Sequence, residues 1–307
     1  MEKVMKNFFL FLSKNPAAVK TAKKHGLKFG ASRFVSGESL HSALQVVEKL
    51  NAKNMMATLD HLGEFVNTEE EAKFSTQECI EALKEMHSRG VQANLSLKLT
   101  QIGLDISDEL VLQNMRSILQ VAKETGNFVR IDMEDYSRNE KTLTLFKTLK
   151  EEFPTEVGTV IQAYLYKSLN DVVALNAYKP NLRICKGAYK ESQTVAFPDK
   201  RDVDITYVKM VKKHLQNGNY AAIATHDGKI IQEIIAYIEE NQIPLTQFEF
   251  QMLYGIQNEL LEELAQKGYQ TRVYVPYGRD WYGYFMRRLA ERPANVWFVL
   301  KNIKKSK

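Results

Sequence analysis

The sequence lacks the usual signals of a disulfide framework, a metal centre and a phosphate-binding loop. Its 307 residues contain two cysteines, Cys79 and Cys185, and their spacing fits no metal site. Two isolated cysteines in so long a chain are typical of a reducing compartment, so we predict a cytoplasmic protein. The motifs HExxH, GxSxG, GxGxxG and GxxxxGKS/T are absent, as are clusters of cysteine and histidine. These absences predict no metal and no Rossmann or P-loop nucleotide site.

A long apolar run is missing as well. The patch FFLFL at 8–12 is far too short to span a bilayer, and no cleavage site with small residues follows it. A peripheral contact of this patch with the inner face of the cell membrane stays open. The net charge of +5 is spread along the chain apart from the tail KNIKKSK. Such a tail is more typical of a solvated terminus than of a nucleic-acid arm, so we predict no nucleic-acid partner.

Apolar segments with strand character alternate with stretches of helical periodicity along most of the chain. The eight strand candidates lie at 55–61, 91–99, 127–133, 157–164, 181–187, 220–226, 248–253 and 271–277. Several of the helical stretches close on a glycine, as C-caps do, at Gly90, Gly126, Gly218 and Gly268. Eight strands with helices between them predict an α/β fold of the (βα)8 TIM-like barrel type. The strands are apolar along most of their length, as in a parallel sheet buried on both faces.

An open, doubly wound sheet is the alternative architecture. Such a sheet usually has fewer strands and a glycine-rich first turn, which this chain lacks. Extra helices are predicted before the barrel, at about 15–25 and 39–50. We expect a single catalytic domain over 1–307, with N-terminal helices in 1–54 and the barrel in 55–300.

The segment 272–293 combines the last strand with a basic helix. Asp280 resembles an N-cap, and the predicted helix 281–292 ends at Pro293. One face of this helix carries Tyr284, Arg287, Arg288 and Glu291. Adjacent arginines beside a tyrosine form a fork suited to a carboxylate or a phosphate. A solvated basic turn, paired with the glutamate, is the other interpretation.

In a barrel of this type, chemistry takes place at the C-terminal ends of the strands. The residues near these ends are Asp60, His61, Lys98, Asp132, Glu134, Gln162, Tyr164, Arg183, Lys186, Gly187, Tyr189, Thr225, His226, Asp227, Gln251, Leu253, Tyr254, Tyr274 and Tyr277. The cations Lys98, Arg183, Arg287 and Arg288 outweigh the few anions, so the pocket is predicted to bind anionic ligands. Because no nucleophile stands beside an obvious base, we expect a bound cofactor to carry the chemistry.

Single residues of this set also have structural interpretations. Lys98 fits a half-buried lysine paired with a carboxylate such as Asp132. His226 fits a buried histidine with satisfied hydrogen bonds. Arg183 lies inside an apolar run, where a buried arginine requires a nearby anion.

Seven ordered motifs of the chain resemble the proline dehydrogenase family. They are LSLKL, RIDME, VIQAYL, RICKGAYKE, ATH, FEFQMLYG and a Tyr-x-x-Arg-Arg-x-x-Glu helix, and the resemblance covers about 34–299. It implies a distorted (βα)8 barrel that holds non-covalent FAD. It also implies oxidation of L-proline to Δ1-pyrroline-5-carboxylate, the first step of proline catabolism, with electrons passed to a quinone or membrane electron acceptor. The chain is similar to the short, monofunctional members.

The resemblance also implies roles for individual residues. The proline carboxylate would be held by Lys98, Arg287 and Arg288, and its ring walled by Tyr189, Leu253, Tyr274 and Tyr284. Arg183 would lie near the flavin N5, and Asp132 would orient the polar network beside the substrate. The other residues implied at FAD are Met133, Gln162, Lys186, Gly187, Ala188, Thr225, His226 and Glu291. Glu64 is similar to a glutamate that pairs with the arginines, whereas Lys190 departs from the aromatic residue of many relatives.

Two other functions stay open at this point. An aldolase-like barrel would use Lys98 or Lys186 to form a Schiff base with its substrate. An amino-acid sensor would bind proline without turnover. The oligomeric state is not predicted.

Overall fold

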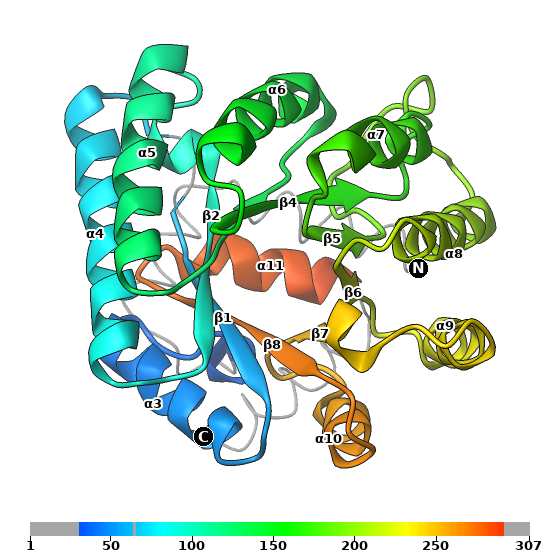
Figure 1. Cartoon of the computed structure of the whole chain (residues 1–307). Helices are drawn as coiled ribbons and strands as arrows, with labels where there is room; N and C mark the ends of the chain where they lie inside the picture. The colour runs from blue at the N-terminus through cyan, green and yellow to red at the C-terminus, as the bar shows by residue number, and fades with distance from the viewer. Residues whose placement is uncertain (1–30, 64–65, 292–307) are drawn as a thin grey trace.

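The fold is a closed barrel of parallel strands surrounded by helices (Figure 1). The computed structural model describes residues 31–63 and 66–291. Within these residues, each strand from β1 to β8 pairs in parallel with the next, and β8 pairs with β1 to close the ring. The predicted (βα)8 barrel is therefore confirmed, and the open doubly wound sheet is wrong.

The strands are β1 (Met56–His61), β2 (Ala93–Lys98), β3 (Val129–Asp132), β4 (Val157–Gln162), β5 (Leu182–Cys185), β6 (Ala221–Ala224), β7 (Phe248–Leu253) and β8 (Thr271–Tyr277). The α-helices are α3 (Leu40–Asn51), α4 (Glu69–Ser88), α5 (Asp108–Glu124), α6 (Tyr136–Glu152), α7 (Ser168–Leu175), α8 (Lys200–Gln216), α9 (Gly228–Glu240), α10 (Asn258–Gln266) and α11 (Trp281–Glu291). Short 3-10 helices are η2 (Ala31–Arg33), η3 (Leu99–Ile102), η4 (Asn176–Tyr178) and η5 (Leu245–Gln247).

Local capping signals set several of the helix boundaries. Ser39 and Thr68 form capping boxes at the starts of α3 and α4, where their hydroxyl groups accept from the backbone N–H three residues later. The four predicted C-terminal glycines all adopt positive φ, between 61° and 87°. The predicted helix at 39–50 is confirmed as α3, and the one predicted at 15–25 lies outside the described residues.

The interior of the barrel is lined by polar side chains. The largely apolar composition of the strand sequences did not predict this. Tyr274 of β8 bonds to Asp132 of β3, and Arg183 of β5 bonds to Gln251 of β7. Neither pair belongs to adjacent strands, so these side chains meet inside the ring. The prediction of strands that are apolar along most of their length is therefore wrong for the positions that face the axis. These inward positions include Thr58, Asp60, Asn94, Ser96, Lys98, Arg130, Asp132, Arg183, Glu249, Gln251, Arg272 and Tyr274.

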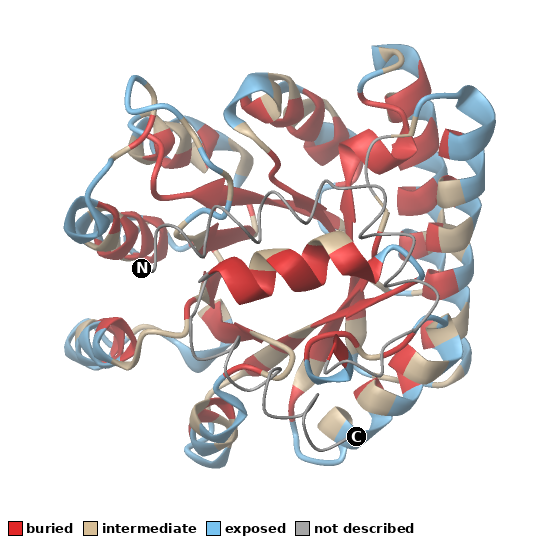
Figure 2. Ribbon diagram, turned by 180° about the vertical axis from the view of Figure 1, so that it is seen from behind, coloured by how far each residue is buried: buried red, intermediate tan, exposed pale blue. Residues whose placement is uncertain are grey.

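Helix α11 crosses the open end of the barrel (Figure 2). Trp281, Phe285 and Leu289 of this helix belong to a buried cluster with Phe34, and the two phenylalanine ring centroids lie 6.1 Å apart. The indole N–H of Trp281 donates to Glu38 at 3.1 Å. These contacts fix the apolar side of α11 to the segment that precedes α3. The side that carries Arg287 and Arg288 therefore faces the barrel.

No helix among the described residues is both long and apolar enough to cross a membrane.

Candidate active site

A cavity of about 590 Å³ lies between α11 and the C-terminal ends of the strands. Its lining comes from all eight strands and from α11: Asp60, Lys98, Asp132, Met133, Val160, Gln162, Arg183, Cys185, Lys186, Gly187, Ala188, Tyr189, Lys200, Ala224, Thr225, His226, Asp227, Gly228, Gln251, Met252, Leu253, Tyr274, Tyr284, Arg287 and Arg288. The structure thus brings together every predicted site residue except Glu291, whose side chain lies outside the described residues. Glu64 lies outside them too.

A cleft of about 760 Å³ opens at the other end of the barrel. Its lining includes Met56, Ala93, Asn94 and Arg272, which lie at the starts of their strands. Active sites in (βα)8 barrels are built at the C-terminal ends instead, where the loops can vary without disturbing the core. We therefore assign the active site to the cavity beneath α11.

The cavity carries an excess of positive charge. Among the described lining residues, six lysine and arginine side chains face three carboxylates, those of Asp60, Asp132 and Asp227. Cations that a carboxylate of the protein does not neutralise attract anionic ligands into a confined site. The predicted excess of positive charge is confirmed.

Lys98 pairs with Asp60, whereas the partner suggested from the sequence was a carboxylate such as Asp132. Its Nζ lies 3.5 Å from Oδ2 of Asp60, which is 1% exposed. Asp132, the expected partner, instead pairs with Arg183 at 2.6 Å. Because Lys98 is the last residue of β2, its ammonium group lines the cavity. A ligand carboxylate can therefore bind to it in addition to Asp60.

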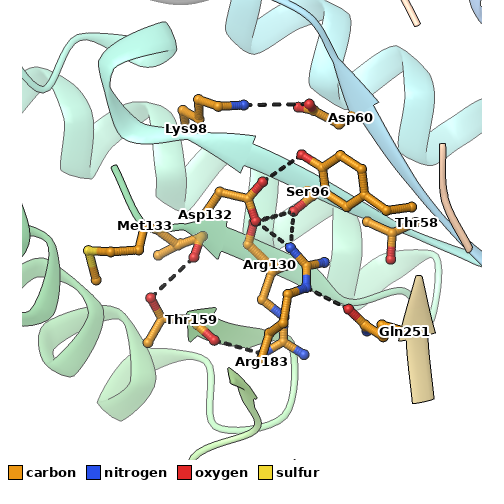
Figure 3. A network of polar contacts seen from close by, with 12 residues as sticks. Thr58, Asp60, Ser96, Lys98, Arg130, Asp132, Met133, Thr159, Arg183 and Gln251 are labelled. Carbon is orange, nitrogen blue, oxygen red and sulfur yellow. Dashed lines mark hydrogen bonds and ion pairs between the residues drawn. The ribbon is translucent and has the colours of Figure 1, made fainter. Parts of the chain in front are cut away.

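Arg183 is the centre of a buried hydrogen-bond network (Figure 3). Its Nη1 donates to Oδ1 of Asp132 at 2.6 Å, and its Nε donates to Oε1 of Gln251 at 2.6 Å. Its guanidinium carbon lies 5.1 Å from the ring centroid of Tyr274. The predicted need for a nearby anion is confirmed, and the anion is Asp132.

Asp132 is kept ionised by this network. Burial raises the pKa of its carboxyl group, but the charges of Arg183 and Lys98 and hydrogen bonds from Ser96 and Tyr274 outweigh burial and lower it overall. Burial and the negative charge of Asp132 raise the pKa of the Tyr274 phenol well above its ordinary value. At neutral pH the pair is therefore a carboxylate that accepts a hydrogen bond from a neutral phenol.

The arginines of α11 are part of the cavity wall and not a solvated turn. Arg288 is 7% exposed, and its guanidinium carbon lies 5.0 Å from the ring centroid of Tyr284. Arg287 is half-buried and lines the same cavity. Because Tyr284 precedes Arg288 by one helical turn, the ring and both guanidinium groups face the cavity together.

The segment after β5 approaches the cavity with its backbone. Gly187 has a φ of 112°, and a Cβ there would lie 2.2 Å from the ring of Tyr164. Only glycine fits this position. Any other residue would be strained at this φ, and its Cβ would clash with the Tyr164 ring. Lys186 beside it pairs with Asp204 at 2.6 Å and with Asp227 at 3.3 Å, close to the N-terminus of α9.

His226 has a defined hydrogen-bond role. Its Nε2 accepts from the backbone N–H of Leu253 at 3.0 Å, so Nε2 carries no proton in this arrangement. The bond ties the end of β6 to the end of β7 at the rim of the cavity.

Gln162 and Arg183 each present a buried polar atom with no hydrogen-bond partner in the described part of the chain. These atoms are the acceptor Oε1 of Gln162 and the donor Nη2 of Arg183. Both residues line the cavity. A buried polar atom without a partner costs about 1–3 kcal/mol, so the pair fits a ligand that offers a donor and an acceptor together. The edge of a flavin ring offers both.

Several lining residues were not predicted as site residues. Asp60 and Asp227 stood among the strand-end residues without an assigned role, and Cys185 had none. Burial raises the pKa of the Cys185 thiol to about 12, so it is not an activated nucleophile. The sequence signal for Asp60 was its position near the end of the predicted strand 55–61.

The fold and the cavity define a (βα)8-barrel protein with a cationic site suited to anionic ligands. A family model described as proline dehydrogenase matches residues 43–301. The chain is 51% identical over 302 residues to proline dehydrogenase 1 of Bacillus subtilis, a match that covers 98% of this chain and 100% of the relative. It is 45% identical to a proline dehydrogenase of Deinococcus radiodurans over 90% of each chain.

A crystal structure of proline utilization A (PutA) from Bdellovibrio bacteriovorus, inactivated by N-propargylglycine, has the same barrel. The TM-score is 0.80 at 29% identity, over 85% of this chain and 32% of that chain. The chain belongs to the proline dehydrogenase family. The resemblance in the sequence and the prediction of a proline dehydrogenase enzyme are thereby confirmed.

Proposed function

We propose that this chain oxidises L-proline to Δ1-pyrroline-5-carboxylate, with non-covalently bound FAD as the hydride acceptor. Family membership supports proline oxidation in proline catabolism. The observation that carries the cofactor assignment is a pair of buried atoms, on Gln162 and Arg183, that have no hydrogen-bond partner among the described residues. Both residues line the cavity that also holds the cationic clamp. When bound, FAD supplies the two-electron acceptor, and the side chains supply binding and orientation.

The substrate carboxylate is assigned to Lys98, Arg287 and Arg288. Two guanidinium groups and one ammonium group line the same cavity, and an arginine offers a planar fork that matches a carboxylate. The ring walls are assigned to Tyr189, Leu253, Tyr274 and Tyr284. Holding the carboxylate and the ring at once fixes one face of the ring toward the hydride acceptor, which supplies the orientation that the reaction needs.

The flavin ring edge is assigned to Gln162 and Arg183. A fixed guanidinium group beside the flavin ring would stabilise the negative charge that reduction adds to the ring. The remaining cofactor contacts are assigned to Met133, Lys186, Gly187, Ala188, Thr225, His226 and Glu291. Lys186 suits a phosphate, because its charge lies near the N-terminus of α9.

Asp132 is assigned to orientation and not to proton transfer. A carboxyl group whose pKa is lowered stays ionised at neutral pH and is a weak base, so it holds Arg183 and Tyr274 in place. The amine of proline must lose a proton before the ring carbon beside the nitrogen can release a hydride. We assign that proton to solvent.

Electrons are then passed to a quinone-type acceptor of the membrane. This part of the proposal is supported only by what the resemblance of the sequence motifs to the family implies. It is compatible with a cytoplasmic chain that can make peripheral contact with the inner face of the cell membrane.

The visible spectrum before and after anaerobic addition of L-proline tests the function. We expect yellow protein whose flavin is released by denaturation, is FAD and is bleached by proline. Colourless protein that stays inert after incubation with FAD would contradict the proposal. Flavin that proline does not reduce would indicate a sensor, and a borohydride-trapped adduct on Lys98 or Lys186 would indicate an aldolase.

A substitution separates the role of Arg183 from simple folding. Arg183→Met is expected to slow flavin reduction more than it weakens proline binding, because the cation acts on the reduced flavin. Lost folding with an unchanged reduction rate in the surviving fraction would make Arg183 a structural ion-pair residue.

A further inference from the structure

Arg183 of β5 is held by a hydrogen bond to Gln251 of β7, a strand that is not its neighbour. β5 and β7 are separated by β6, whose inward residue Ala222 is in register with Arg183 on one side and with Glu249 on the other. Alanine has no side chain beyond Cβ, so the guanidinium group can cross over β6. It reaches Oε1 of Gln251 at 2.6 Å.

Glu249 fixes the orientation of the Gln251 amide. The Nε2 of Gln251 donates to Oε1 of Glu249 at 2.5 Å, and a carboxylate can only accept. The amide oxygen must therefore point away from Glu249, toward Arg183. Both side chains are buried, at 2% exposed for Glu249 and 3% for Gln251, so water does not compete for these bonds.

Glu249 is itself held as an anion. The Nε of Arg272 lies 2.8 Å from Oε1 of Glu249 and 3.0 Å from Oε2. Burial raises the pKa of the Glu249 carboxyl group, but Arg272 and the amide of Gln251 outweigh burial and lower it. A series of hydrogen bonds thus runs inside the barrel from the cation Arg272 through the anion Glu249 and the neutral amide of Gln251 to the cation Arg183.

We propose that Gln251 and Glu249 are positioning residues, which hold the Arg183 guanidinium toward the flavin and stabilise its charge from the side opposite to Asp132. The inference rests on the function proposed above. Asp132 binds Nη1 and Gln251 binds Nε, so two directions of the planar group are fixed. The Nη2 that has no partner in the described residues is the remaining donor. Because the guanidinium group is planar, fixing Nη1 and Nε also fixes the direction of Nη2. A donor that is held in place before the reaction can stabilise charge that develops during it.

Gln251→Met tests the proposal, because methionine has a similar length and removes both hydrogen bonds. We expect the rate of flavin reduction by proline to fall about 10- to 100-fold, in the range for loss of a bond to a charged group. The apparent KM for proline should change by no more than about threefold, since the carboxylate clamp is intact. The flavin midpoint potential should become more negative. This readout does not depend on turnover. A purely structural residue would leave it unchanged.

Glu249→Gln is the second variant. It keeps the volume and removes the charge, so the Gln251 amide loses its fixed orientation and an intermediate shift of potential and rate is expected. Gln247→Met is the matched control. Gln247 also makes amide hydrogen bonds, to the carbonyl groups of Leu215 at 2.7 Å and Asn219 at 3.2 Å, just before β7. Its loss should lower thermal stability without changing the flavin potential.

The outcomes are distinct. Wild-type potential and reduction rate in a folded, flavin-loaded Gln251→Met protein overturn the inference and leave the proposed function intact. Failure of both barrel variants to fold also overturns it, because the pair would then be structural. Wild-type protein that proline does not reduce refutes the proposed function itself.

Discussion

Tyr274 of β8 and Asp132 of β3 are joined by a hydrogen bond of 2.7 Å from the phenol to Oδ2, although β1 and β2 separate their strands. The same carboxylate accepts from Arg183 at its other oxygen, Oδ1. The guanidinium group of Arg183 in turn lies beside the Tyr274 ring. Together with Ser96 of β2, which donates to the same oxygen Oδ1, side chains of four strands therefore meet at one buried carboxylate, which forms part of the floor of the cavity under α11.

Tyr274→Phe is expected to weaken this floor. The ring and its contact with Arg183 remain, but Oδ2 of Asp132 loses a donor, which costs about 1.5–3 kcal/mol for a bond to a charged group. The free energy of unfolding, measured in urea, should fall by that amount, and flavin reduction should slow. Tyr207→Phe is the control, since the buried Tyr207 hydroxyl has no hydrogen-bond partner in the described residues. Equal effects of the two substitutions would contradict the prediction.

Arg287→Ala and Arg288→Ala are expected to raise the apparent KM for proline. Loss of one charged hydrogen bond costs about 1.5–3 kcal/mol, or roughly 10- to 150-fold in affinity. Arg287→Lys should recover only part of the loss, because an ammonium group lacks the planar fork. Steady-state kinetics with proline and with carboxylate inhibitors measure both effects.

The control for the arginine variants is Arg279→Ala. Arg279 is exposed just before α11 and does not line the cavity. Normal proline kinetics in both Arg287→Ala and Arg288→Ala would show that the carboxylate clamp is assigned wrongly.

Gly187→Ala is expected to weaken flavin binding. A methyl group at this φ of 112° meets the Tyr164 ring, so the backbone beside the proposed cofactor site must move. A strain of about 1–3 kcal/mol corresponds to roughly 5- to 150-fold in flavin affinity, measured by titration of the apoprotein. Gly126→Ala is the control, because Gly126 also has positive φ but nothing lies within 4 Å of its added methyl group. Similar flavin affinities in the two variants would refute the argument.

His214 predicts a pH dependence of stability that is separate from catalysis. It is fully buried, its Nε2 lies 3.0 Å from the carbonyl oxygen of Tyr220, and burial lowers the pKa of His214 from 6.5 to about 4. The unfolded chain therefore binds this proton at higher pH than the folded chain does. The free energy of unfolding contributed by the group is fully present above pH 6.5 and falls as the pH drops to 4, by about 3 kcal/mol at most.

Urea unfolding between pH 7 and pH 4 checks this prediction. His214→Gln should flatten the pH dependence, because the variant has no imidazole to protonate. His41→Gln, which changes an exposed side chain, is the matched control. An unchanged slope in His214→Gln would show that other groups cause the pH dependence.

The sequence by itself determined the order and the limits of the barrel elements. Those limits depend on local chemistry, such as the hydroxyl cap of Thr68 on α4 and the positive φ of Gly126 after α5. The eightfold alternation then left few alternatives to a barrel. The family motifs in the sequence also contain the residues that line the cavity, so the sequence alone identified them as candidates.

Only the tertiary structure decided which of these residues meet. Lys98 pairs with Asp60 and Asp132 with Arg183, and Gln251 joins Arg183 to Glu249. Asp132, Arg183 and Gln251 come from β3, β5 and β7, none of which is the neighbour of another. Their contacts depend on the stagger of the closed sheet and on small residues such as Ala222, which leave room across the barrel. No local pattern in the sequence contains that stagger, because it results from closing all eight strands at once.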